Sequence, residues 1–201
     1  MLRNYNGKGN DLGQEGAITR FLARELGYDG GSDWAEADMM YCFFFSTMRN
    51  NGVSHDGQEF SVAALRDAGG SKMEDRPTYQ ETFRLNDLDK AERSLLALDY
   101  FEERLAASSG PFLLGSDPCY VDFGIFYILF ELGEVNNCTD WREKFGLPHL
   151  GRLLDAVAAK PNVEEFLASP RRMPRYERAN DGKSLYTYIE GKLSPNHANL
   201  T

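Results

Sequence analysis

The side chains that most often carry out enzyme chemistry are few in this sequence and lie far apart. The three histidines are His55, His149 and His197. None has a Cys, Asp or Ser spaced for a catalytic triad or a metal cage, so we expect solvated or capping roles for them. Two pairs of neighbouring carboxylates are typical of exposed helix faces: Glu102/Glu103 and Glu164/Glu165. The sequence therefore predicts no catalytic residue and no metal ligand.

The cysteines offer little redox chemistry. Cys42, Cys119 and Cys138 form no CxxC pair, and three thiols cannot all pair within one chain. Reduced, partly buried thiols in a reducing compartment are the simplest interpretation, with a redox or metal role as the alternative.

Four arginines lie close together near the carboxyl end: Arg171, Arg172, Arg175 and Arg178. They are either surface ion-pair partners of the chain's own carboxylates, each pair worth under about 1 kcal/mol, or a docking patch for an acidic partner. The formal net charge of −9 argues against non-specific nucleic-acid binding, which needs clustered Lys and Arg.

The elements that would position these residues are helices. With 201 residues and 42% hydrophobic content, the chain is suited to one packed domain. Apolar spacings of three and four, helix caps and Pro or Gly boundaries predict helices at about 17–26, 32–50, 78–107, 120–133, 148–159 and 161–168. The loop at 51–77 has room for a short helix at 62–67. No segment has the alternation of a strand, so the predicted fold class is all-α, with six or seven helices.

Three stretches, taken together, resemble the glutathione S-transferase family. Residues 112–122 (FLLGSDPCYVD) are similar to the stretch that opens the central helix of its C-terminal domain. Residues 147–170, from LPHL through KPNV to FLASP, are similar to the end of that domain. Residues 14–23 (QEGAITRFLA) resemble the last helix of its thioredoxin-like N-terminal domain.

The resemblance covers about residues 14–170 and implies three parts. Residues 1–29 would be an N-terminal arm and the remnant last helix of a thioredoxin-like domain. Residues 30–170 would form the glutathione S-transferase C-terminal-like helical bundle, and 171–201 an irregular tail. Upstream of Gln14 the rest of the thioredoxin-like domain has no counterpart, through either a real truncation or an incomplete gene model. That missing part carries the family's thiol-activating residue.

The family's glutathione contacts are altered at the positions that remain. The Ser that holds the γ-glutamyl carboxylate corresponds to Glu15. Two carboxylates about 4 Å apart repel by roughly 4 kcal/mol at an effective dielectric near 20. The lost hydroxyl bond adds about 1 to 3 kcal/mol. We therefore interpret Gln14 and Glu15 as a degenerate glutathione site and expect no cofactor, glutathione being expected only if the chain is an active transferase.

The central helix has an altered cap. Cys119 replaces the family's capping Ser or Thr, at a cost of about 1 kcal/mol, while Asp122 can still accept from the backbone N–H of residue 119.

The second predicted helix is apolar almost all round. Its candidate interface or substrate residues are Met40, Tyr41, Phe44, Phe45 and Met48. Such a helix is buried on more than one side or forms an interface. The resemblance also allows a hydrophobic acceptor-substrate pocket there.

The leading hypothesis is a non-catalytic glutathione S-transferase-like protein with a structural or protein-binding role, as a subunit of a larger assembly. It would bind a partner or self-associate through the apolar second helix, the arm at 1–16 or the tail after Ser169. The alternatives are a glutathione transferase for hydrophobic electrophiles, seen without its N-terminal half, and a carrier of an apolar ligand. No leader follows Met1 and no stretch is long enough for a membrane span, so we expect an intracellular protein, cytoplasmic or organellar.

Overall fold

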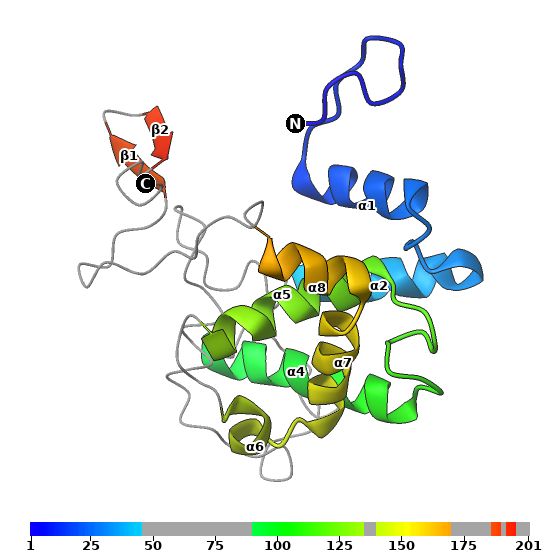
Figure 1. The fold of residues 1–201 in the computed structure, drawn as a ribbon, viewed down its shortest axis with the longest axis vertical. Helices are drawn as coiled ribbons and strands as arrows, with labels where there is room; N and C mark the ends of the chain where they lie inside the picture. The colour runs from blue at the N-terminus through cyan, green and yellow to red at the C-terminus, as the bar shows by residue number, and fades with distance from the viewer. Residues whose placement is uncertain (46–89, 135–139, 170–185, 190–191, 196–201) are drawn as a thin grey trace.

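The computed structural model describes residues 1–45, 90–134, 140–169, 186–189 and 192–195 (Figure 1). The α-helices of these ranges are α1 (Glu15–Glu25), α2 (Trp34–Phe44), α4 (Lys90–Ala107), α5 (Tyr120–Glu134), α6 (Trp141–Phe145), α7 (Pro148–Ala158) and α8 (Pro161–Ala168). A 3₁₀ turn, η1 (Gly31–Asp33), precedes α2. Two strands, β1 (Tyr186–Ile189) and β2 (Lys192–Pro195), lie in the tail.

The core forms where α5 packs against α2 and α7, and α4 packs against α7. Its largest fully buried side chains include Met40, Leu98, Phe101, Leu105, Ile125, Leu129, Phe145 and Leu147. Gly124 allows α2 and α5 to approach closely, because a Cβ there would lie 2.9 Å from Cε1 of Phe44. The apolar stripe of α4 and the apolar sequence of α5 therefore explain why these helices form the interior.

The helical prediction is confirmed. α1, α2, α5, α7 and α8 occur where their spacing predicts them, with ends that differ by a few residues. The predicted helix at 78–107 is seen from Lys90, and its first part lies outside the described residues. The end of the second helix at 46–50, the loop at 51–77 and the short helix at 62–67 also lie outside the described residues.

The sequence analysis missed α6, which is only five residues long. It buries Trp141 and Phe145 four positions apart and ends at Gly146, whose φ of 69° is left-handed. One turn of helix gives too few apolar positions to show a period, so tertiary burial determines this element.

The prediction of an irregular, strand-free tail is wrong for eight residues. β1 and β2 pair antiparallel, with Tyr186 opposite Pro195 and Ile189 opposite Lys192. Aromatic and β-branched residues in β1 favour a strand, but four residues give almost no alternation to detect.

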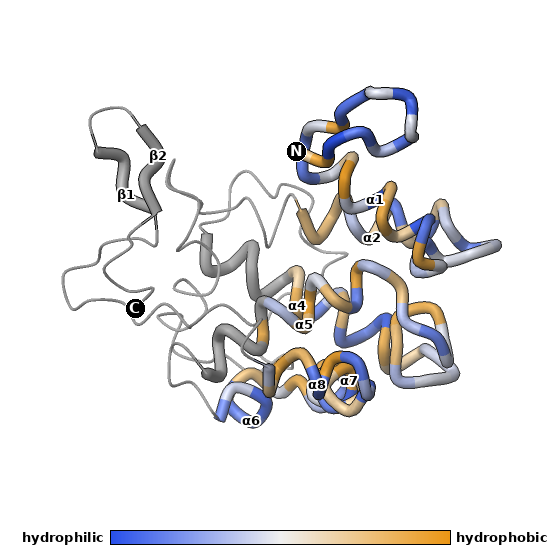
Figure 2. The backbone as a smooth tube through the Cα atoms, turned by 45° about the horizontal axis from the view of Figure 1, so that its top comes forward, coloured by the Kyte–Doolittle hydropathy of each residue, from blue (hydrophilic) through white to orange (hydrophobic). Residues whose placement is uncertain are grey.

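The N-terminal arm folds back on itself and then onto α1. Leu2 and Leu12 exchange two backbone hydrogen bonds of 2.8 Å, and Arg3 pairs with Asp11 at 2.6 Å. The ring of Tyr5 packs edge-on against Phe21 of α1, with centroids 5.2 Å apart. Figure 2 shows this arm as mostly hydrophilic, whereas the helices below it alternate between hydrophilic and hydrophobic residues.

Candidate functional site

Two hollows open where α1 faces α2, and Arg20 lines both of them. The Glu15 hollow, of about 510 Å³, is lined by Gln14, Glu15, Gly16, Ala17, Arg20, Tyr41, Cys42 and Phe45. The Trp34 hollow, of about 550 Å³, is lined by Arg20, Arg24, Asp29, Gly31, Trp34, Asp38 and Tyr120. Both volumes are in the range of small-molecule sites.

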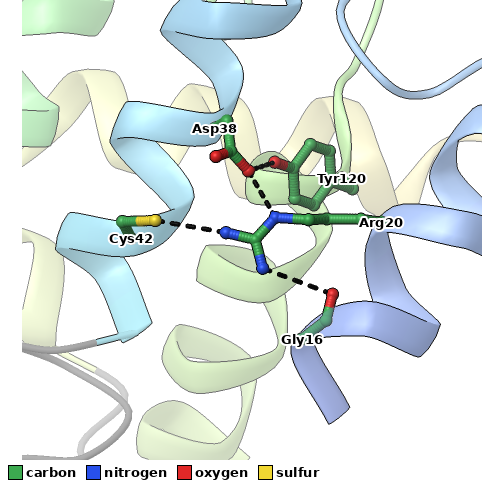
Figure 3. A network of polar contacts seen from close by, with 5 residues as sticks. All are labelled: Gly16, Arg20, Asp38, Cys42 and Tyr120. Carbon is green, nitrogen blue, oxygen red and sulfur yellow. Dashed lines mark hydrogen bonds and ion pairs between the residues drawn. The ribbon is translucent and has the colours of Figure 1, made fainter. Parts of the chain in front are cut away.

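Arg20 links three helices through one polar network (Figure 3). Its Nε donates to Oδ1 of Asp38 at 2.5 Å, and the Tyr120 hydroxyl donates to the same oxygen at 3.1 Å. Its other nitrogens donate to the Gly16 carbonyl at 3.4 Å and to Sγ of Cys42 at 3.2 Å. The guanidinium also lies 4.8 Å from the centre of the Tyr41 ring, a cation–π contact.

The electrostatics of this network favour binding over proton transfer. The hydrogen bond from Arg20 holds the pKa of Asp38 below its usual value and raises that of Arg20 itself. Burial, reinforced by Asp38, raises the pKa of Tyr120, and burial raises that of Tyr41. At neutral pH the site therefore presents a fixed ion pair and neutral phenols, neither suited to general acid–base catalysis.

The structure brings together four residues that the sequence analysis singled out separately. Gln14 and Glu15 at the start of α1 line the same hollow as Tyr41 and Phe45 of α2. Gln14 has a φ of 67° and a ψ of 124°, a strained conformation for a non-glycine residue. Sequence reasoning missed Arg20, Asp38 and Tyr120. The available signal was Asp38, an acidic residue directly before the apolar run of α2.

Three of the five residues predicted as interface or substrate residues, Met40, Tyr41 and Phe44, are buried in the core. Burial is one of the two outcomes that the apolar sequence of this helix predicts, and Tyr41 also lines the Glu15 hollow. The interface or substrate role of these residues stays a prediction. Phe45 is half-buried, with its ring centroid 5.7 Å from that of Tyr41.

Five other predicted site residues lie outside the described residues. They are Met48 and the four arginines near the carboxyl end, Arg171, Arg172, Arg175 and Arg178.

Asp122 forms the hydrogen bond that the sequence analysis expects. Its Oδ2 accepts from the backbone N–H of Cys119 at 2.7 Å, and its Oδ1 accepts from that of Leu113 at 3.0 Å. Burial raises the pKa of Asp122 to about 6, although both N–H groups act in the opposite direction. Burial also raises the pKa of the Cys119 thiol to about 12, so this cysteine is unreactive at neutral pH.

Glu102 corrects another expectation, since it is buried rather than exposed. Its two oxygens accept from the backbone N–H groups of His149 and Leu150, each at 2.8 Å. These N–H groups lie in the first turn of α7, which Pro148 opens, and therefore have no acceptor within the helix itself. Glu102 of α4 therefore caps a helix 46 positions further along the chain, a pairing that no local sequence pattern reveals.

The arrangement of helices and the buried cap define the class of this domain. The described core is a helical bundle whose central helix starts at the Asp122 cap, as in the helical domain that the sequence resembles. Residues 75–170, just under half of the chain, match the family model "Glutathione S-transferase, C-terminal domain". This segment is therefore similar to that domain family. No curated protein and no solved structure matches the chain.

Among the described residues, no helix has the length and apolar character to cross a membrane. Within the same ranges, no three His, Cys, Asp or Glu side chains gather as a metal-binding group.

Proposed function

We propose that this chain is a non-catalytic glutathione S-transferase-like protein that binds a protein partner or a second copy of itself. The observation that carries the first part is the Glu15 hollow. It combines a carboxylate, where the family resemblance implies a hydroxyl for glutathione, with an Arg20 already held by Asp38. A second anion there meets repulsion and gains little from the paired guanidinium.

The interior of α2 supports the same proposal. In the resemblance, this helix would line a pocket for hydrophobic electrophiles. Met40 and Phe44 instead fill the space against α5, where Phe44 contacts the position of Gly124. The described part of the site therefore provides packing where an acceptor substrate would need room.

The protein-binding part rests on apolar side chains that face outward from the α1–α2 edge. The residues are Leu22, Leu26, Trp34 and Met39, each between 40% and 66% exposed. These residues belong to two helices that the Arg20–Asp38 ion pair joins, and exposed apolar side chains are candidates for an interaction surface. These exposed residues are not the ones that the sequence analysis predicts for an interface, three of which lie on the buried face of α2.

Titration of glutathione into the purified chain tests the non-catalytic assignment. We expect no heat at glutathione concentrations up to about 1 mM, where even a weak site would respond. The matched variant Glu15→Ser removes the carboxylate and restores a hydroxyl. We expect any glutathione binding to be stronger in this variant than in the wild type. Tight binding to the wild-type chain would overturn the proposal.

Sedimentation of the same sample tests the surface. We expect self-association of the wild-type chain, or a defined complex with an added partner. Both should be lost in the double variant Leu26→Lys, Met39→Lys. The control is Met1→Lys, an equally exposed apolar side chain on the arm. A chain that sediments as a monomer and binds no partner would contradict the role assigned to this edge.

The alternative of a glutathione transferase has one observation in its favour. Gln14 is strained at the edge of the Glu15 hollow, and strained backbone is concentrated at ligand-binding positions. The glutathione titration separates the two hypotheses, because a transferase must bind its cosubstrate.

A further inference from the structure

The Trp34 hollow has features that a protein-binding edge does not require. Trp34 is the first residue of α2 and is 61% exposed, although tryptophan is among the most costly side chains to leave in water. Among the described residues no aromatic ring packs on its indole. The ring is therefore an open stacking surface at the edge of the hollow.

The position of Trp34 is fixed by the turn before it. Gly30 has a φ of 93°, and a Cβ at that position would lie 3.0 Å from the Cβ of Ala37 and 3.1 Å from Leu114. The 3₁₀ turn that follows leads directly into α2. Because only glycine fits this turn, the backbone that carries the indole is well defined.

The two arginines of the hollow differ in their partners. Arg20 is neutralised by Asp38 at 2.5 Å. Arg24 is exposed, and in the described part of the chain no carboxylate pairs with it. One carboxylate oxygen of Asp29 accepts a hydrogen bond from the Gly31 N–H at 3.1 Å. The hollow therefore contains one cation available to an anion, beside an open aromatic face.

We propose that the Trp34 hollow binds a small planar aromatic acid, with its ring on Trp34 and its carboxylate on Arg24. Guanidinium binds carboxylate through two parallel hydrogen bonds, and indole stacks on flat rings. The volume of about 550 Å³ is sufficient for a ligand of one or two rings. This proposal goes beyond the protein-binding role: it shares Trp34 with the proposed protein-binding edge, but it rests on the hollow that Trp34 lines together with Arg24.

Calorimetric titration with 1-naphthoate tests the site, with the neutral 1-naphthalenemethanol as the comparison ligand. We expect the acid to bind and the alcohol to bind at least about tenfold more weakly, because the alcohol lacks the charge. Arg24→Gln should weaken binding of the acid about tenfold, and Trp34→Ala should weaken both ligands. Arg3→Gln, a change to an exposed arginine on the arm, should leave the affinity unchanged.

Asp29→Asn should change the affinity for the acid in the opposite direction to Arg24→Gln. The asparagine oxygen can still accept from the Gly31 N–H, while one negative charge leaves the hollow. Binding of the acid should become about two- to threefold tighter. A weaker affinity for the acid in this variant would overturn the proposal, because the removal of a negative charge from the hollow should favour an anionic ligand.

The two tryptophans of the chain provide the location of the ligand. Trp141 is 3% exposed and Trp34 is 61% exposed. In a ¹⁵N–¹H spectrum, 1-naphthoate should shift the indole N–H signal of Trp34, assigned with Trp34→Phe, and leave that of Trp141 in place. No heat with the acid, equal affinity for acid and alcohol, or a shift of Trp141 alone would each refute the site.

Discussion

Asp38 and Asp122 are carboxylates in two different environments, the α1–α2 edge and the helical core. Asp38, at the open α1–α2 edge, accepts a hydrogen bond from Arg20, and this bond lowers the pKa of its carboxyl group. Asp122, in the closed core, accepts hydrogen bonds from two backbone N–H groups and from the Cys119 side chain, and burial raises its pKa to about 6. The edge holds charges in pairs beside solvent, whereas the core uses carboxylates as fixed hydrogen-bond acceptors. The comparison assigns the proposed binding to the edge and most of the stability of the fold to the core.

The largest expected effect is at Asp122. Asp122→Ala leaves the buried N–H groups of Leu113 and Cys119 without an acceptor. We expect a loss of about 4 kcal/mol in the free energy of unfolding, since each orphaned donor costs about 1 to 3 kcal/mol. Urea denaturation of the wild type and the variant measures this difference in the free energy of unfolding. The control Ser116→Ala, next to the same loop but exposed, should change stability by less than about 0.5 kcal/mol.

The pH dependence at Asp122 is the next largest effect. Its pKa is raised from 3.8 to about 6 on folding, so the native chain binds more protons there than the unfolded chain between these values. The contribution of Asp122 is therefore greatest below pH 4 and falls by up to about 3 kcal/mol as the pH rises through 6. The difference in unfolding free energy between the wild type and Asp122→Asn, measured from pH 4 to 7, isolates this contribution. A difference that rises with pH would contradict it.

Two glycines of the core allow a matched comparison, with an expected effect on stability of intermediate size. An added Cβ at Gly124 meets the rigid ring of Phe44 at 2.9 Å, whereas one at Gly151 meets Cδ of the flexible Arg142 at the same distance. We expect Gly124→Ala to destabilise by about 1 to 2 kcal/mol, and Gly151→Ala to be near neutral because the arginine can move. Thermal unfolding of both variants gives the comparison. Equal melting temperatures would show that α2 and α5 can separate without cost.

The smallest effect on stability is expected at the edge. Asp38 and Arg20 are both more than a third exposed, so solvent screens their attraction. Asp38→Asn should cost less than about 1 kcal/mol of unfolding free energy, and its cost should shrink in high salt. Because the pKa of Asp38 is lowered on folding, the contribution of this ion pair is fully present above the unfolded pKa of Asp38 and is lost as the pH falls through its lower folded pKa. A loss as large as that of Asp122→Ala would erase the distinction between edge and core.

The sequence predicts this molecule best where the pattern is long and local. The stripe of α4, the apolar length of α5 and the Pro residues that open α7 and α8 each specify a helix from neighbouring residues alone. The hydrogen bond from Cys119 to Asp122 spans three positions, so it too was predictable. Short elements were missed, because α6 and the β1–β2 hairpin have too few residues for a period.

Contacts between distant segments were not predictable. Glu102 looked like any exposed helix carboxylate, and only the packing of α4 against α7 reveals it as a cap. The same holds for α2, whose composition indicated a buried or interacting helix. It could not indicate that Met40, Tyr41 and Phe44 face inward while Trp34 and Met39 remain exposed.

The sequence by itself determined the helices, the helical domain family of residues 75–170 and the acidic character of the chain. These follow from spacing and composition, which act over one or a few helical turns. Tertiary structure decided which charges are paired, since Arg20, Asp38 and Tyr120 come from three helices and meet only after packing. It also decided which apolar side chains remain open to a ligand, because burial depends on the neighbours that a folded chain supplies.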